Sequence, residues 1–372
     1  MLATSSKNAP RAAATAAAQS FLQVGAILQF VAVVAALTIW SAAANAVEQA
    51  AVEQTAAEPT PTLLRFGYPN PPNTDQYHDL IEGWTQKVNS DAGGVFRVQV
   101  FAGNTLIDMR STLDRVEDGV ADIAFCVLGP VSSLFPQTLV ATLPGAAIDS
   151  RDTGLALQRL YDTGVIADEW KKVKPLAFGI YPGLTFHTVR MVKTLEDFKG
   201  LKISIQDRIA GQTLEALGGV PISMPLDQLY EALQHGTIQG ATLGWPGVAG
   251  YKLTDVVKYH VLEPFGAIEA VIIMNNATYA KLSPEAKRVI DADSGTFLTD
   301  WFGRVVDHTT QQAIDEIRHM KGQTVEPLSP DQRALWMHRI EPVIASWEKS
   351  TPNGPQVLAA FRKEVAAIHA GP

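Results

Sequence analysis

GLKISIQDRIAGQTLEALGG, residues 200–219, joins a strand pattern, LKISI, to a helix pattern, DRIAGQTLEALG. Asp207 is suited to cap the start of that helix, and Gly218 is suited to end it. Backbone N–H groups are unpaired where a strand leads into a helix, so such a junction attracts anions. The stretch therefore predicts an α/β unit with a ligand held beside Ser204 or Arg208.

The same alternation of strand and helix patterns occurs earlier in the chain. The segments are LLRFGY (63–68), DQYHDLIEGWTQKV (75–88), VFRVQVF (95–101), RSTLDRVEDGV (110–120) and ADIAFCVL (121–128). The apolar spacing assigns them in turn to strand, helix, strand, helix and strand. This order is typical of a layered α/β domain.

A second unit of this kind begins near residue 176, and a helical tail follows it. The further strands are LAFGIY (176–181), IQGATLGW (238–245) and AVIIMN (270–275), and MPLDQLYEALQHG (224–236) is a helix. Helix patterns then cover 283–320, 329–349 and 355–369. Two α/β lobes predict a cleft between them, where small ligands usually bind.

Composition limits the class of protein. The chain has 372 residues, 18% charged and 47% hydrophobic, which is enough for one large or two ordinary globular domains. A net charge of −8 argues against nucleic-acid binding and against a basic membrane patch. The single cysteine, Cys126, lies in an apolar strand pattern and is expected to be a core residue.

Residues 1–46 have the pattern of an export signal peptide. Lys7 and Arg11 precede the apolar run FLQVGAILQFVAVVAALTIW, and Ala44-Asn45-Ala46 is a small-x-small cleavage site. The alternative is a retained membrane anchor, because about 20 apolar residues can span a bilayer. We expect cleavage near Ala46, a flexible lead-in over 47–61, and a periplasmic mature protein.

No pattern for catalysis or for a cofactor was found in the sequence. The eight histidines are scattered, without the spacing of a zinc site, and no nucleophile elbow, P-loop or GxGxxG motif occurs. We therefore expect no cofactor, no metal and no enzymatic activity. An exported binding protein is the leading interpretation.

Several ordered motifs resemble one family. They are GNTLIDMRSTLDRVEDGVADIAF, TLEDFKGLKI, ALGGVPISMPLDQLYEALQHGTIQG and VIIMNNATYAKLSPEAKRVID. Over about residues 62–350 the chain resembles the solute-binding proteins of tripartite ATP-independent periplasmic (TRAP) transporters. The resemblance implies a two-lobed periplasmic binding protein fold that closes on a small organic acid. It also implies delivery of that acid to an ion-gradient-driven membrane permease.

With that fold, lobe I is expected to comprise 62–182 and about 270–310, and lobe II 183–269 and about 311–372. A long helix connects the lobes, and a helical tail ends the chain. We expect a monomer.

The chain departs from the family at the residues that usually hold the ligand. The family carries an arginine after GLKI that pairs with the ligand carboxylate, and Ser204 stands at that position here. Leu184 lies near the place of a second basic residue, and Leu243 near the place of an asparagine. Either Arg208 takes over the anchor role, or the ligand is held by Ser204 and backbone donors without a carboxylate pair.

The other positions near the family's pocket are mostly apolar or aromatic. They are Tyr181, Leu184, Phe186, Leu226, Leu243 and Trp245, with Asn70 and Thr105 as polar candidates on the first lobe. For the aliphatic residues ordinary core packing is an equal alternative, and for Asn70 and Thr105 a plain turn. A pocket that is short of arginine and rich in aromatic side chains favours an aromatic or hydrophobic monocarboxylate.

Two other functions stay open at this point. The protein could present its ligand to a sensor kinase instead of a permease. It could also be a periplasmic enzyme on a binding-protein fold, which requires a base and a nucleophile that converge, such as His187 with Asp207.

Overall fold

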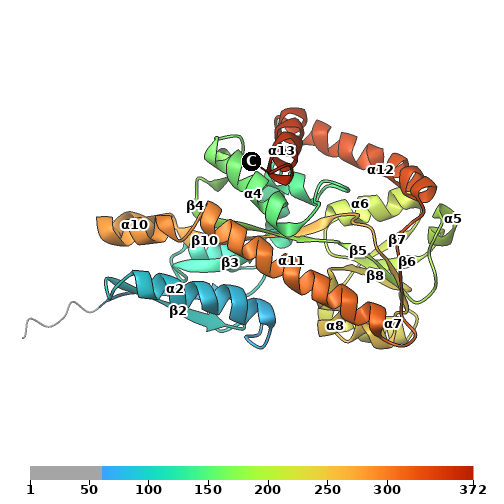
Figure 1. Ribbon diagram of the computed structural model, residues 1–372, viewed down its shortest axis with the longest axis horizontal. Helices are drawn as coiled ribbons and strands as arrows, with labels where there is room; N and C mark the ends of the chain where they lie inside the picture. Colours follow the sequence, from blue (N-terminus) through green and yellow to red (C-terminus); the bar gives the residue numbers. More distant parts are fainter. Residues whose placement is uncertain (1–60, 372) are drawn as a thin grey trace, which may run out of the picture. The chain divides into compact units, whose positions relative to one another are not determined.

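The computed structural model describes residues 61–371, and these contain two β-sheets with helices around them (Figure 1). The expected signal peptide over 1–46 and residues 47–60 of the expected lead-in lie outside the described residues. Within 61–371 no helix combines the length and apolar character needed to cross a bilayer.

The first sheet has five strands in the order β2-β1-β3-β10-β4. Their bounds are β1 Thr62–Tyr68, β2 Phe96–Ala102, β3 Ile123–Val127, β4 Val173–Pro182 and β10 Ala267–Asn275. β1 pairs in parallel with β2 and β3, and α2 (Gly83–Asp91) and α3 (Thr112–Glu117) supply the crossovers. The expected strand-helix-strand-helix-strand order is confirmed, and β10 adds an antiparallel neighbour to both β3 and β4.

The second sheet has six strands in the order β11-β9-β5-β8-β6-β7. Their bounds are β5 Thr185–Thr188, β6 Lys202–Ile205, β7 Val220–Ser223, β8 Gly240–Leu243, β9 Tyr259–Val261 and β11 Thr324–Glu326. β6 is parallel to β7 and β8, so the carboxyl ends of these three strands share one edge. Helix α6 (Arg208–Leu217) follows β6, α7 (Leu229–Gln234) follows β7, and α8 (Trp245–Gly250) follows β8.

The remaining helices surround these sheets. The longer ones are α4 Ser150–Asp162, α10 Pro284–Ala292, α11 Thr296–His319, α12 Pro330–Ser350 and α13 Gly354–His369. The short ones are η1 Tyr77–Glu82, η2 Gly129–Leu134, η3 Thr138–Thr142, η4 Ala167–Trp170, α5 Leu195–Phe198, η5 Leu226–Gln228, η6 Leu253–Asp255 and α9 Asn276–Lys281. The expected helix over 283–320 is two helices, because Gly295 at φ 61° separates α10 from α11.

Two crossing segments connect the sheets. β4 leads into β5 through Gly183, and β9 leads into β10 through Gly266. The Leu184 amide donates to the Gly266 carbonyl at 3.1 Å, and the Phe265 amide donates to the Leu184 carbonyl at 3.1 Å. Gly183 has φ 76°, a conformation that side chains with a Cβ rarely adopt.

Helices α11 and α12 each contact both sheet systems (Figure 1). α11 packs on α4 and β4, and further along on α8 and β11. Trp336 in the first half of α12 belongs to a core cluster of the second sheet, whereas Trp347 in its second half belongs to a cluster of the first. Pro342 lies inside the helix between these halves.

Helix α13 packs on α4, which lies beside the first sheet. This packing differs from the expected placement of 311–372 in the second lobe. The other lobe boundaries stay predictions.

Cys126 is buried, as expected for a core residue. Burial raises the pKa of its thiol to about 12, which makes the reactive thiolate scarce near neutral pH.

The contact between β4 and α11 requires a glycine at one position. A Cβ at Gly179 would lie 2.0 Å from the ring of Phe302, which is fully buried. We expect Gly179→Ala to lower the free energy of unfolding by about 1–3 kcal/mol because the ring has no free space to move into. Urea denaturation measures this change. The matched control is Gly250→Ala, where a Cβ meets no heavy atom within 4 Å, and equal destabilisation by both variants would contradict the packing argument.

Candidate ligand-binding site

Two polar side chains without partners mark the carboxyl end of β6. Ser204 is fully buried on the strand, facing Ile222 of β7 and Ala241 of β8 across the ladder. Ser204 Oγ and the Nε2 atom of Gln206, two residues later, are buried without a hydrogen-bond partner among residues 61–371. A buried donor that stays unpaired costs about 1–3 kcal/mol. This edge of the sheet therefore holds two donors that an acceptor group would satisfy.

Arg208 is close to these donors in sequence, but unlike them it is exposed to solvent. It is the first residue of α6, as expected, and it is exposed. No hydrogen bond or ion pair within residues 61–371 involves its guanidinium. Its neighbour Ile209 is buried in the core cluster of the first sheet. The structure thus places Arg208 at the predicted helix start, with its side chain in solvent.

Asp207 caps α6 as the sequence predicts. Its Oδ1 accepts from the Ala210 amide at 2.8 Å, and Gly218 ends the helix with φ 101°. Burial raises the pKa of Asp207, and the bonds from backbone amides lower it in part. This cap uses one of the free N–H groups that an anion would need, so the donors of Ser204 and Gln206 are the more available ones.

Apolar side chains close the neighbouring strand end. Leu243 ends β8, and Trp245 begins α8, with exposed fractions of 4% and 2%. A Cβ at Gly183 would lie 3.5 Å from Trp245 Nε1, so the indole N–H edge lies against the connection between β4 and β5. Leu226, which begins η5, packs in the same core cluster as Leu243 and Trp245. These three predicted pocket residues share one face of the second sheet with Ser204.

Phe186 and Leu184 are placed differently. Phe186 packs on Phe198 and Phe265 in the core cluster on the other face of the sheet, towards α12. The structure therefore does not bring Phe186 together with Ser204 and Trp245. Leu184 is buried in the connection beside Gly266.

On the first sheet, Tyr181 is the predicted residue with a polar partner. Its hydroxyl accepts a hydrogen bond from Gln76 Nε2, and its ring packs edge-on against Phe302. Burial raises the pKa of Tyr181 well above its ordinary value, so the hydroxyl keeps its proton. Gln76 lies just before η1, and nothing in its sequence context distinguished it.

Asn70 and Thr105 are turn residues in the structure. The Asn70 carbonyl accepts from the Gly103 amide at 3.0 Å, and Asn70 lies beside the hydroxyl of buried Tyr68. Thr105 is exposed, and its Oγ1 donates to the Ala102 carbonyl at 3.1 Å. The two residues follow β1 and β2, whose ends are adjacent in the parallel ladder.

A buried histidine pair lies behind Trp245. His187 on β5 and His260 on β9 are directly opposite in the ladder, with exposed fractions of 0% and 3%. Their Nδ1 atoms are 2.7 Å apart, and the centroid of the His187 ring lies 5.0 Å from that of Trp245. Burial, and then the neighbouring His260, lower the pKa of His187 to about 3. Nothing in the sequence pairs these histidines, because 73 residues separate them.

The proposed enzymatic pair does not form. Both ring nitrogens of His187 are engaged, one with His260 and the other with the Leu243 carbonyl, while Asp207 caps α6. A general base must reach the proton that it abstracts. The arrangement of these two residues therefore does not support the enzyme hypothesis.

Glu269 is a second buried group that the sequence did not single out. It lies on β10 opposite Ile180, and both carboxyl oxygens are buried without a partner among residues 61–371. Burial raises its pKa well above the ordinary value, and Glu169 adds to the effect. The neutral acid is thus the favoured form of Glu269.

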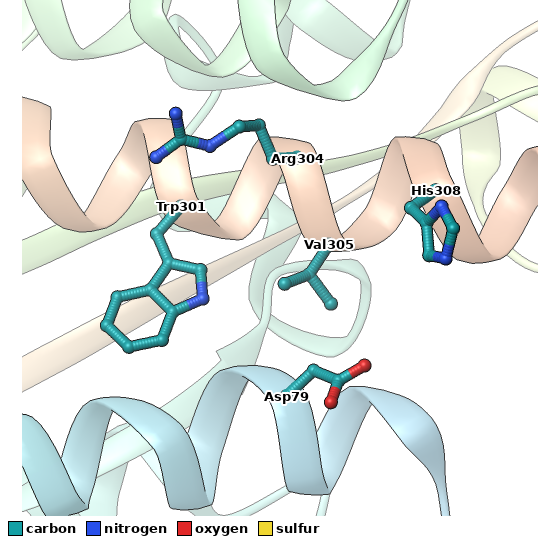
Figure 2. A pocket seen from close by; sticks show the side chains of 5 residues that line it. All are labelled: Asp79, Trp301, Arg304, Val305 and His308. Carbon is teal, nitrogen blue, oxygen red and sulfur yellow. The ribbon is translucent and has the colours of Figure 1, made fainter.

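A cavity of about 390 Å³ lies elsewhere, between η1 and α11. Figure 2 shows Trp301 and Val305 extending from α11 towards the helical turn that carries Asp79. Arg304 also lines it, and its guanidinium pairs with Asp300 at 2.6 Å. None of the predicted ligand-binding residues lines this cavity, so it is not the candidate site.

The sequence of the chain matches a known protein family and several curated proteins. Residues 66–350 match the model of the bacterial extracellular solute-binding protein family 7. The 2,3-diketo-L-gulonate-binding periplasmic protein YiaO of Escherichia coli is 25% identical over 305 residues, which are 80% of this chain and 90% of that protein.

Two solved structures are similar over most of the chain. One is a marine metagenome TRAP solute-binding protein specific for aromatic acids, with 3-hydroxybenzoate; its TM-score is 0.75 at 27% identity, covering 83% of this chain and 99% of that one. The other is a TRAP solute-binding protein from Rhodoferax ferrireducens with benzoate; its TM-score is 0.75 at 26% identity, covering 82% of this chain and 98% of that one.

The cap of α6 can be tested separately from ligand binding. Asp207→Ala should lower the free energy of unfolding by about 1 kcal/mol, because the Ala210 amide loses its acceptor. Asp207→Asn should retain most of the stability, since asparagine is an equally good cap. Urea denaturation of both variants measures this, with exposed Arg208→Ala as the control. A loss as large in Arg208→Ala as in Asp207→Ala would show that the guanidinium has a structural role.

Proposed function

Because the chain belongs to the bacterial extracellular solute-binding proteins of family 7, we propose that it captures an aromatic or hydrophobic monocarboxylate outside the cytoplasm. It then delivers this ligand to the membrane subunits of a TRAP permease driven by an ion gradient. The ligand is bound and released unchanged, without a cofactor.

The observation that carries the ligand class is the pair of unpartnered donors at the end of β6. Ser204 Oγ and Gln206 Nε2 are neutral, buried, and close to the apolar end of β8. A carboxylate can accept from both, and hydrogen bonds to a charged group contribute about 1.5–3 kcal/mol each. The apolar side, where Leu243 and Trp245 lie, offers no charged donor for a second carboxylate.

Trp245 gives the second argument. An indole provides a large apolar face, and aromatic pairs contribute about 0.5–1.5 kcal/mol beyond the area that they bury. The two similar structures hold 3-hydroxybenzoate and benzoate, which agrees with an aromatic ring beside the carboxylate. Benzoate is therefore the first probe for this protein.

Thermal shift of residues 47–372 with a panel of acids tests the ligand class. Benzoate at about 100 times its dissociation constant should stabilise the protein by roughly 2.7 kcal/mol, a shift of about 5 °C. The panel also contains 3-hydroxybenzoate, succinate, glucuronate and the neutral analogue benzamide. Tighter binding of succinate than of any aromatic acid would rule out the proposed class.

Variants assign the anchor. Ser204→Ala and Gln206→Met should each weaken benzoate binding roughly 10-fold to 150-fold, because a donor to the carboxylate is lost. The same two variants should slightly stabilise the free protein, because each removes an unpaired buried donor. Arg208→Ala is the matched control and should change neither property. If Arg208→Ala abolishes the shift instead, the exposed arginine is the anchor.

Export is tested on the intact protein. Cleavage after Ala46 would give a mature chain that begins at Val47. Expression of the full chain in a bacterium, followed by osmotic shock and intact-mass measurement, should recover that species in the periplasmic fraction. A species of full-length mass in the membrane fraction would show that the apolar run is retained as an anchor.

A further inference from the structure

Two neutral rings cannot make all the hydrogen bonds of the histidine pair behind Trp245. Each ring faces a fixed acceptor on one side and the Nδ1 atom of the other ring on the opposite side. The Nε2 atom of His187 lies 3.0 Å from the Leu243 carbonyl, which can only accept, so this nitrogen carries a proton. Since a neutral imidazole has one N–H, a neutral His187 would present a bare Nδ1 to His260.

His260 is fixed in the same way through Gln323. The Nε2 atom of Gln323 donates to the Thr254 carbonyl at 2.7 Å, so its Oε1 is the atom that faces His260. His260 Nε2 lies 2.8 Å from that Oε1 and must donate to it. A neutral His260 therefore also presents a bare Nδ1.

Two bare nitrogens 2.7 Å apart repel each other, whereas one proton between them makes a short hydrogen bond. We propose that His187 and His260 share a single proton, and that this buried positive charge is the counter-charge of the anionic ligand. This inference rests on the proposed function. The shared proton supplies a positive charge at a site where Ser204 stands in place of the family's arginine.

The position of the pair supports this role. Leu243, whose carbonyl binds His187, ends β8 beside the candidate site. Trp245 lies between the pair and the connection of β4 to β5, with ring centroids 5.0 Å from His187 and 5.7 Å from His260. The ring planes of His187 and Trp245 meet at 88°, an edge-to-face arrangement. His187 is opposite Ala241 of β8, and Ala241 is opposite Ser204 of β6, so His187 lies two strands away from Ser204 on the same face of the sheet.

No acid among the surrounding groups neutralises the pair. Lys258, which directly precedes β9, opposes a charge on His260, and its Nζ donates to the Thr254 carbonyl. Glu326 on β11 pairs with Lys193 at 2.7 Å, and Asp255 on η6 is exposed.

The other elements around the pair contribute mainly apolar side chains. Ala313 and Ile317 of helix α11 pack in the same core cluster as Leu243 and Trp245, and Asp315 of this helix pairs with Arg318. Tyr259, the remaining titratable group on β9, precedes His260 in the strand. Within the described residues, therefore, the proton lacks a fixed anionic partner.

The consequence is a link between ligand and proton. Burial lowers the pKa of both histidines, so the free pair binds a proton weakly. A bound anion raises the pKa of the pair, and the complex then holds more protons than the free protein. Affinity must rise as the pH falls, by at most tenfold per pH unit for one proton.

Calorimetry with benzoate measures this directly. Titrations of the mature protein between pH 8 and 6, in phosphate and in an amine buffer (Tris at the upper end of the range, bis-Tris at the lower), give the number of protons taken up per ligand. We expect an uptake above zero and up to one, with affinity increasing towards pH 6. A carboxylic acid of ordinary pKa stays ionised over this range, so the ligand does not contribute. Binding with a heat that is independent of the buffer would overturn the proposal.

Variants locate the proton. His260→Asn should abolish the uptake, whereas His338→Asn, at an exposed histidine paired with Glu341, should leave it unchanged. If His260→Asn does not fold, the wild-type titration still decides. Uptake that persists in folded His260→Asn would assign the proton to another group.

Nitrogen NMR separates this inference from the proposed function. In protein with ¹⁵N-labelled histidine, lowering the pH should move both Nδ1 resonances together to values between the protonated and the bare ones, which would show the shared proton. Two Nδ1 resonances that titrate independently of each other, as two separate rings do, would exclude it. If no acid in the panel binds, the proposed function and the counter-charge role fail together, and these resonances alone decide whether the pair holds a proton.

Discussion

The long antiparallel pairing of β4 with β10 is the constraint on which the rest of the structure depends. It runs from Val173 opposite Asn275 to Pro182 opposite Ala267, and both strands then continue towards the second sheet. The bonds between Leu184 and the Phe265-Gly266 segment extend this pairing across the connection. These hydrogen bonds hold the two crossing segments together. Gly183 in the first segment is thereby held against Trp245, which follows β8.

Local signals in the sequence predicted most elements of this fold. Asp207 and Gly218 mark the ends of α6 because capping is a short-range effect of backbone geometry. The strand-helix alternation before residue 128 followed from apolar periodicity. The break at Gly295 was missed, since the apolar spacing continues across it and a single glycine in a helix pattern is ambiguous.

The candidate site was less predictable, because its groups meet only through tertiary structure. Sequence reasoning proposed Ser204, Trp245 and Arg208 for the site, but it could not tell that Ser204 is fully buried and that Arg208 is exposed. Gln206 was overlooked, as was the pairing of His187 with His260, which depends on the register of β5 against β9. A polar residue has no periodic signature, and only its burial distinguishes it from a surface residue.

Pro342 gives α12 a mechanical property that its length alone would not. The first half of the helix is fastened to the core of the second sheet and the second half to the core of the first. Proline has no N–H and removes one backbone hydrogen bond at the point where the helix passes between them. The helix therefore bends more easily at Pro342 than elsewhere along its length. A change in the angle between the two cores would bend α12 most easily at Pro342.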